Sequence, residues 1–127
     1  IPSSVRTYLR TDTDVLAAFG QRIFVLYVPD GADYPFAVIR TVTDPAFYTQ
    51  DGESTRETIV QIDTFDDSLS DAYTNAGKIR DALTGHSGVM GSHTVGGVFV
   101  REGQDQWMSD VRHFKVFYQY VINWTVT

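Results

Sequence analysis

The sequence predicts an α+β fold in which two main helices cover one face of an antiparallel or mixed sheet of about five strands. Residues 56–65 alternate in polarity with the period of two that is typical of a strand. Residues 69–83 then repeat apolar side chains at three- and four-residue steps, as an amphipathic helix does. Because most of the other predicted strands are neighbours joined by short loops, the helices are expected on one face of the sheet.

The N-terminal segment predicts a helix that breaks and then resumes. Ser3 or Ser4 is the expected N-cap, since a side-chain oxygen there accepts hydrogen bonds from the first helical turn. The apolar stripe is interrupted at Asp12, so Asp12 or Thr13 is expected to cap a short second helical segment. Gly20 is the residue expected to end that segment.

Two strands and a loop are expected next. Residues 22–28 form an apolar run that ends at the turn signal Pro29–Gly31. Residues 35–42 predict a second strand, with the proline tolerated at its first position. Residues 44–55 are polar and acidic and predict a loop.

The central helix has marked ends. Ser68 stands at the expected N-cap, and Asp71 follows three residues later, as a capping box requires. Gly85 stands just beyond the last apolar position, where a glycine readily adopts a positive φ. The spacing therefore predicts a helix over residues 69–83.

The C-terminal third predicts a mobile loop, two strands and a turn. Residues 86–93 are rich in glycine and serine and predict the loop. Residues 95–101 predict a strand, and residues 102–110 a turn or hairpin tip. Residues 111–127 predict a strand much longer than usual, which either extends past its own sheet to pair with another subunit or contains a bulge. One face of this last strand carries Phe114, Val116, Tyr118, Tyr120, Ile122 and Trp124.

Composition narrows the function. The 127 residues are expected to form one domain, 1–127, and no apolar run is long enough to predict a membrane span. With 10 basic and 16 acidic residues, the net charge of −6 argues against a protein that grips nucleic acid over its whole surface. The absence of cysteine excludes disulfides and thiolate metal sites within this sequence.

No catalytic, cofactor or metal site is predicted. His86, His93 and His113, with Asp63 as a possible fourth ligand, do not follow the spacing of a zinc motif. His113 is expected to be half-exposed. The acidic pairs of the chain precede helices, where carboxylates cap the first turn. The glycines lack the pattern of a phosphate-binding loop.

Large apolar side chains in polar segments are the positive functional signal. Phe47 and Tyr48 lie in the first long loop, and Trp107 and Met108 lie in the predicted hairpin tip. Such side chains either fold back on the core or contact a partner. Both interpretations are open from the sequence alone.

Five segments, in order, resemble the tail-completion or tail-terminator proteins of long-tailed bacteriophages and gene-transfer particles. That family pairs an alanine-rich helix ending in Gly-x-Arg-Ile/Val-Tyr/Phe with a Pro-Phe/Tyr-Val-Val segment. A Val-Gln-Ile-Asp strand, a helix ending in Ile-Arg-x-Ala-Leu-x-Gly and a long aromatic last strand follow. The matching segments are Leu16–Phe24, Tyr34–Ile39, Val60–Asp63, Ile79–Gly85 and Phe114–Trp124.

The resemblance implies a structural virion protein and not an enzyme. Proteins of this kind form a six-fold ring at the head-proximal end of the tail, assembled in the host cytoplasm. The ring caps the tail tube, ends its polymerisation and provides the surface on which the head docks. The implied partners are further copies of the chain, the tail tube protein and a head-completion or connector protein, with DNA passing through the lumen without sequence-specific binding.

A ring requires a heterologous interface that closes. The candidates for it are the last strand, with Tyr118 and Tyr120, and the two apolar pairs described above. Three alternatives remain at this stage: a head-to-tail connector of similar fold, a small ligand-binding or enzymatic domain, or a cellular adaptor domain that uses the same aromatic loops. The ligand-binding or enzymatic domain would have a pocket near Tyr73, Asp63 and His113.

Overall fold

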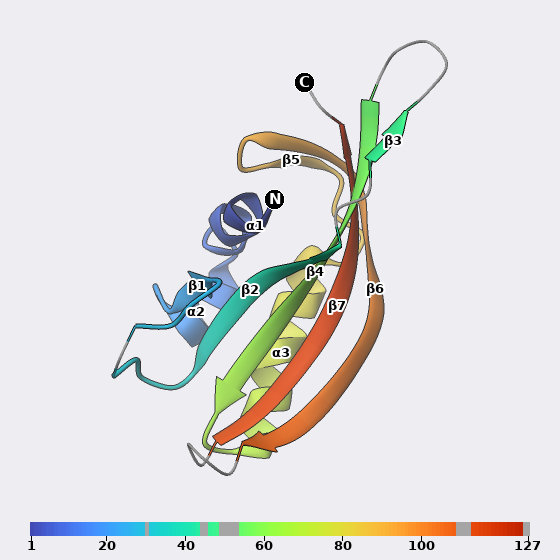
Figure 1. Cartoon of the computed structure of the whole chain (residues 1–127). Coiled ribbons are helices and arrows are strands. Elements are labelled where there is room, and N and C mark those ends of the chain that lie inside the picture. Colours follow the sequence, from blue (N-terminus) through green and yellow to red (C-terminus); the bar gives the residue numbers. More distant parts are fainter. Residues whose placement is uncertain (30, 44–45, 49–53, 109–112, 126–127) are drawn as a thin grey trace.

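A computed structural model describes residues 1–29, 31–43, 46–48, 54–108 and 113–125 (Figure 1). Helices pack on one face of a curled mixed sheet, which confirms the predicted α+β class. The strands follow the order β1-β2-β4-β7-β6-β5, and the short β3 pairs with β4. The path therefore contains six strands instead of about five. The helices are α1 (Pro2–Leu9), α2 (Thr13–Phe19) and α3 (Leu69–Leu83). The strands are β1 (Ile23–Val25), β2 (Phe36–Thr43), β3 (Ala46–Tyr48), β4 (Ser54–Asp66), β5 (Gly88–Met90), β6 (His93–Met108) and β7 (His113–Thr125).

The first two helices break at Asp12, as predicted. The Asp12 carboxylate accepts hydrogen bonds from the backbone N–H groups of Asp14 and Val15, both at 3.0 Å, and so caps α2. Gly20 ends α2 with φ 59°. The predicted cap of α1 is wrong: the helix begins at Pro2, whose fixed φ suits the first helical turn and whose missing N–H is not needed there.

Strand β1 is shorter than the apolar run predicts. Residues 22–28 are all apolar except Arg22, yet the strand ends at Val25 because Leu26 adopts φ 70° and turns the chain. Strand β2 agrees with the prediction to within one residue at each end. The predicted loop at 44–55 is wrong in its described parts, because residues 46–48 form β3 and residues 54–55 already belong to β4.

Helix α3 matches its prediction. The Ser68 hydroxyl accepts a hydrogen bond from the Asp71 N–H at 3.4 Å, and Gly85 adopts φ 80° just beyond the helix. The buried stripe is narrower than expected, since Leu69 and Tyr73 are exposed. The residues of α3 that pack on the sheet are Ala72, Ala76, Ile79 and Leu83.

The predicted mobile loop at residues 86–93 is a β-hairpin. Strand β5 pairs with β6 through a two-residue turn, in which Gly91 takes φ 57° at the first turn position. A Cβ added to Gly91 would lie 2.8 Å from the Ser4 Cα, so only glycine allows α1 to pack this closely. Met90 is fully buried in the core.

The two longest strands also differ from the prediction. Strand β6 continues to Met108, so there is no turn at 102–108. Strand β7 pairs with β4 along one edge and with β6 along the other, from end to end. A strand with both edges occupied cannot pair with a strand of another subunit. The prediction that β7 is long because it extends past its own sheet to pair with another subunit is therefore wrong. The irregularities lie in β6, between Val95 and Gly97 and again between Val100 and Glu102.

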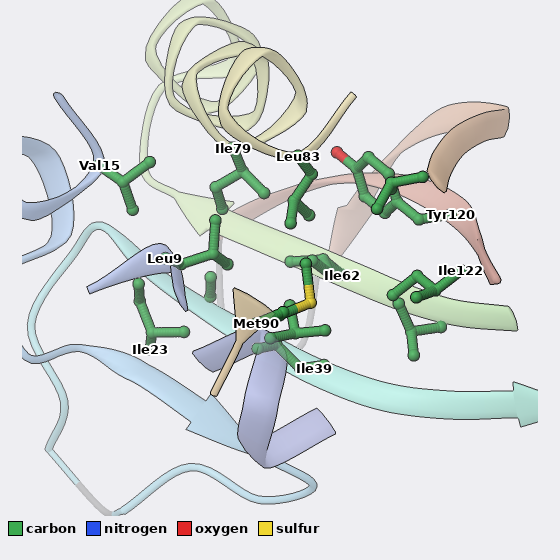
Figure 2. Packing of buried hydrophobic residues seen from close by; sticks show 14 of the residues in the cluster. Leu9, Val15, Ile23, Ile39, Ile62, Ile79, Leu83, Met90, Tyr120 and Ile122 are labelled. Atoms are coloured by element: carbon green, nitrogen blue, oxygen red, sulfur yellow. The ribbon is translucent and has the colours of Figure 1, made fainter. Parts of the chain in front are cut away.

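One main hydrophobic cluster joins the helices to the sheet (Figure 2). It takes side chains from all three helices and from strands β1, β2, β4, β5, β6 and β7. Tyr120 is the largest fully buried side chain, and its pKa is raised by burial. No helix in the described ranges is long and apolar enough to span a membrane.

Candidate interaction surfaces

The two apolar pairs singled out in the sequence lie at opposite ends of the sheet. Phe47 and Tyr48 belong to β3, which pairs with the first residues of β4 at one end. Trp107 and Met108 end β6 at the other, beside the start of β7 (Figure 1). The intervening strands are about 12 residues long, or roughly 40 Å at ~3.3 Å per residue. The four side chains themselves lie outside the described part of the structure.

The two tyrosines of the last strand have different environments. Tyr120 is 1% exposed and belongs to the core. Tyr118 is half-buried, lies against the edge strand β6, and receives the Arg80 guanidinium over its ring at 5.4 Å. A Cβ on Gly103 would lie 2.5 Å from the Tyr118 ring, so this glycine makes room for the tyrosine.

The face of the sheet opposite the helices carries a connected polar row. The amide of Gln119 donates to Gln61 at 3.1 Å, and the amide of Gln61 donates to Asp63 at 2.7 Å. Arg40 approaches the second oxygen of Asp63 at 4.0 Å. Gln61 and Asp63 are buried, whereas the Arg40 side chain is half exposed. These bonds hold the row in one arrangement and satisfy the buried carboxylate.

An aromatic cluster lies on the same face, at the start of β7. His113 packs against Tyr34, Phe36 and Phe65, and its Nδ1 lies 2.9 Å from the Tyr34 hydroxyl. Burial lowers the pKa of His113. The residue is therefore buried and structural, and the half-exposed position expected from the sequence is wrong.

The residues expected to line a ligand pocket do not converge. Asp63 and His113 lie on the helix-free face, whereas Tyr73 lies on α3, which packs on the other face through Ala76 and Val116. No cavity of ligand size is found among the residues that the structure describes. The pocket hypothesis therefore loses its geometric basis.

The remaining histidines hold the N-terminal helix in place. The His93 Nδ1 lies 2.6 Å from the Ser4 hydroxyl, and the His86 ring packs on Tyr8. Burial lowers the pKa of His93. No carboxylate orients this serine–histidine pair, and within the described ranges no three His, Asp or Glu side chains cluster in the way that a metal site needs.

Exposed apolar side chains occur at both edges of the sheet, and the sequence analysis missed them. Leu26 and Tyr27 follow β1 and are 74% and 73% exposed. Phe99 on β6 is 57% exposed. Phe99 follows the alternation of its strand, so only the position of the helices reveals that its face is uncovered.

A family model described as "Tail completion protein gp17" matches residues 3–123. The chain belongs to this family. The resemblance to tail-completion proteins is thereby confirmed, and the protein is a structural component of a phage-type tail. No curated protein matches the chain.

The fold of this tail completion protein also occurs in a solved particle. A chain from the structure titled "Virion of native gene transfer agent (GTA) particle" superposes with a TM-score of 0.73 at 14% sequence identity. The match covers 99% of this chain and 95% of the other. At this identity the likeness establishes the fold. The tail-protein assignment rests on the family match.

Proposed function

We propose that residues 1–127 form one tail-terminator-like domain that assembles into a six-membered ring. The ring caps the head-proximal end of the tail tube, ends tube polymerisation and provides the surface on which the filled head docks. The observation that carries this proposal is the tail-completion family match over residues 3–123. A ring built from one chain fits a mixed sheet whose two edges differ, because a heterologous interface needs two unlike surfaces.

We infer the partners of the ring from the apolar residues at the two ends of the sheet. A protein between tube and head needs contacts at both ends, and the chain has one apolar pair at each: Phe47 and Tyr48 at one, Trp107 and Met108 at the other. We propose that one end contacts the tail tube protein and the other a head-completion or connector protein. Assembly takes place in the host cytoplasm, and the finished ring is part of the virion.

The acidic composition suits a channel for DNA. Six copies at −6 each concentrate about 36 formal negative charges in one ring. We propose that part of this charge lines the lumen, so that DNA passes without adhering and without sequence-specific contacts. A ring structure with a neutral or basic lumen would contradict this part of the proposal.

The role is architectural and not catalytic. Among the residues that the structure describes, no carboxylate orients the serine–histidine pair, and the histidines are engaged in packing contacts. The second candidate is a head-to-tail connector of similar fold, which would use the same two ends but would not control tube length.

Deleting the gene from the parent particle distinguishes these functions by electron microscopy of lysates. The terminator function predicts overlong or ragged tail tubes separate from full heads. Tails of normal length that fail to join heads would assign the connector function instead. Normal infectious particles would overturn both. Complementation with the intact gene is the control that excludes effects on neighbouring genes.

A further inference from the structure

Both long edges of the sheet are left open over part of their length. Strand β1 covers β2 only at Ala37–Ile39, and the last bond to that edge runs from the Leu26 N–H to the Ile39 carbonyl at 3.0 Å. Strand β5 covers β6 only as far as Val95, and beyond it the Gly85 N–H donates a hydrogen bond to the Val98 carbonyl at 3.0 Å. Within the described ranges, Arg40–Thr43 and the part of β6 that follows Val98 therefore pair with one strand each. Open backbone edges of this kind readily accept a further strand.

The opening at β2 is produced by a strained residue. Leu26 adopts φ 70°, which an L-leucine rarely does, and the chain turns away from β2 at that point. The turn leaves Leu26 and Tyr27 exposed beside the edge that they uncover. A straight continuation of β1 over residues 26–28 would have covered this edge.

The two open edges lie at the same height, measured along the direction of the strands. Rows of directly paired residues connect Arg40–Thr43 to the open part of β6. One row contains Arg40, Gln61, Gln119 and Glu102, and the next contains Thr41, Val60, Tyr120 and Val100. Three successive antiparallel pairings also make β2 and β6 antiparallel to each other. A second copy placed beside the first in the same orientation would therefore bring antiparallel edges together at equal height.

The residues along these edges are complementary. Arg40 stands at the β2 end of its row and Glu102 at the β6 end, so copies placed side by side bring a basic and an acidic position into the same row. Leu26 and Tyr27 are exposed on the β1 side of the sheet, and Phe99 and Val100 are exposed on the β6 side. Along the strand direction, these two exposed pairs are offset by no more than about two rows of paired residues. Each edge thus carries exposed apolar side chains, and one shared row has residue types of opposite charge at its two ends.

We propose that β6 of one copy pairs with Arg40–Thr43 of the next copy and continues the sheet from subunit to subunit. This inference rests on the proposed ring and names the surfaces that build it. A heterologous contact closes into a ring only when it adds no rise along the axis, and edges at equal height meet that condition. The strand that pairs with each open edge comes from a second copy of the chain, because one chain carries both of the edges that form the contact.

Cysteine cross-linking tests the contact, because the chain has no cysteine of its own. Thr41→Cys and Val100→Cys place one thiol on each open edge, at exposed positions of the same row. Particles carrying the double variant are treated with a short bis-maleimide and run on a denaturing gel. The expected result is a ladder of covalent multimers up to the ring. Each single variant should give monomers, and particles containing a mixture of both singles should give nothing larger than dimers.

Two further variants keep the test decisive. Thr41→Cys combined with Asp81→Cys, an exposed position on α3, should give monomers under the same treatment. Val42→Cys with Phe99→Cys is a second edge pair for the case in which the first fails to enter particles. Monomers from both edge pairs, in particles with tails of normal length, would overturn the β6–β2 contact and leave the proposed function standing. The gene deletion decides that function separately.

Discussion

Met90→Ala tests whether residues 86–93 form the buried hairpin. The Met90 side chain is fully buried in the main cluster, so the substitution removes apolar contacts and leaves a cavity beneath α1. Truncating a buried methionine to alanine costs about 2–5 kcal/mol. With an unfolding entropy of ~2.1 cal/mol/K per residue, the 127-residue chain loses roughly 4 °C of Tm per kcal/mol, so Tm should fall by about 8–20 °C.

The assay is thermal denaturation followed by circular dichroism at fixed protein concentration. Val89→Ala is the matched control: it removes methyl groups from the neighbouring residue, which is 72% exposed, and should change stability by less than about 0.5 kcal/mol. If Met90→Ala and Val89→Ala melt within about 2 °C of each other, the hairpin is not packed as described, and the loop predicted from the sequence would be the better account.

Three more substitutions test particular contacts. Gly103→Ala should destabilise the chain by about 1–3 kcal/mol in denaturant unfolding, because its Cβ would overlap the Tyr118 ring. Asp12→Ala should lower Tm by an amount equivalent to about 1 kcal/mol, through loss of the α2 cap. His113→Phe should flatten the pH dependence of Tm. Burial lowers the pKa of His113 in the native state below the ordinary 6.5. As the pH falls below about 6.5, His113 is therefore protonated in the unfolded chain before it is protonated in the native state, and the stability of the wild type decreases.

Each of these has its own control. Gly96→Ala in the same strand puts a Cβ at an ordinary contact distance of 3.7 Å, so equal effects of the two glycine substitutions would contradict the role of Tyr118. Asp12→Asn keeps a capping oxygen and should restore most of the stability lost in Asp12→Ala. For His113, identical melting profiles of wild type and variant between pH 7.5 and 5.5 would show that the native histidine titrates normally.

Local signals predicted the elements whose ends the chain itself marks. Ser68, Asp71 and Gly85 define α3 through bonds and torsions within a few residues, and Asp12 defines α2 in the same way. Alternation along β7 also identified the face that carries Tyr120 and Ile122 into the core. Interactions of this range can be read from a single sequence.

The errors occur where a distant residue decides the structure. Gly91 suits a loop as well as a tight turn, and only its contact with Ser4 makes the hairpin part of the core. Gly103 resembles a turn residue but makes room for Tyr118 within a continuous strand. The candidate interface was missed for the same reason, since alternation cannot reveal that no helix covers Phe99 or that Leu26 turns away from β2.

Cryo-electron microscopy of the purified parent particle tests the central claim most directly. The account predicts that this fold occupies the head-proximal end of the tail tube as a closed ring of six copies. Density for the chain elsewhere in the particle, or its absence from the junction between tube and head, would contradict the terminator function.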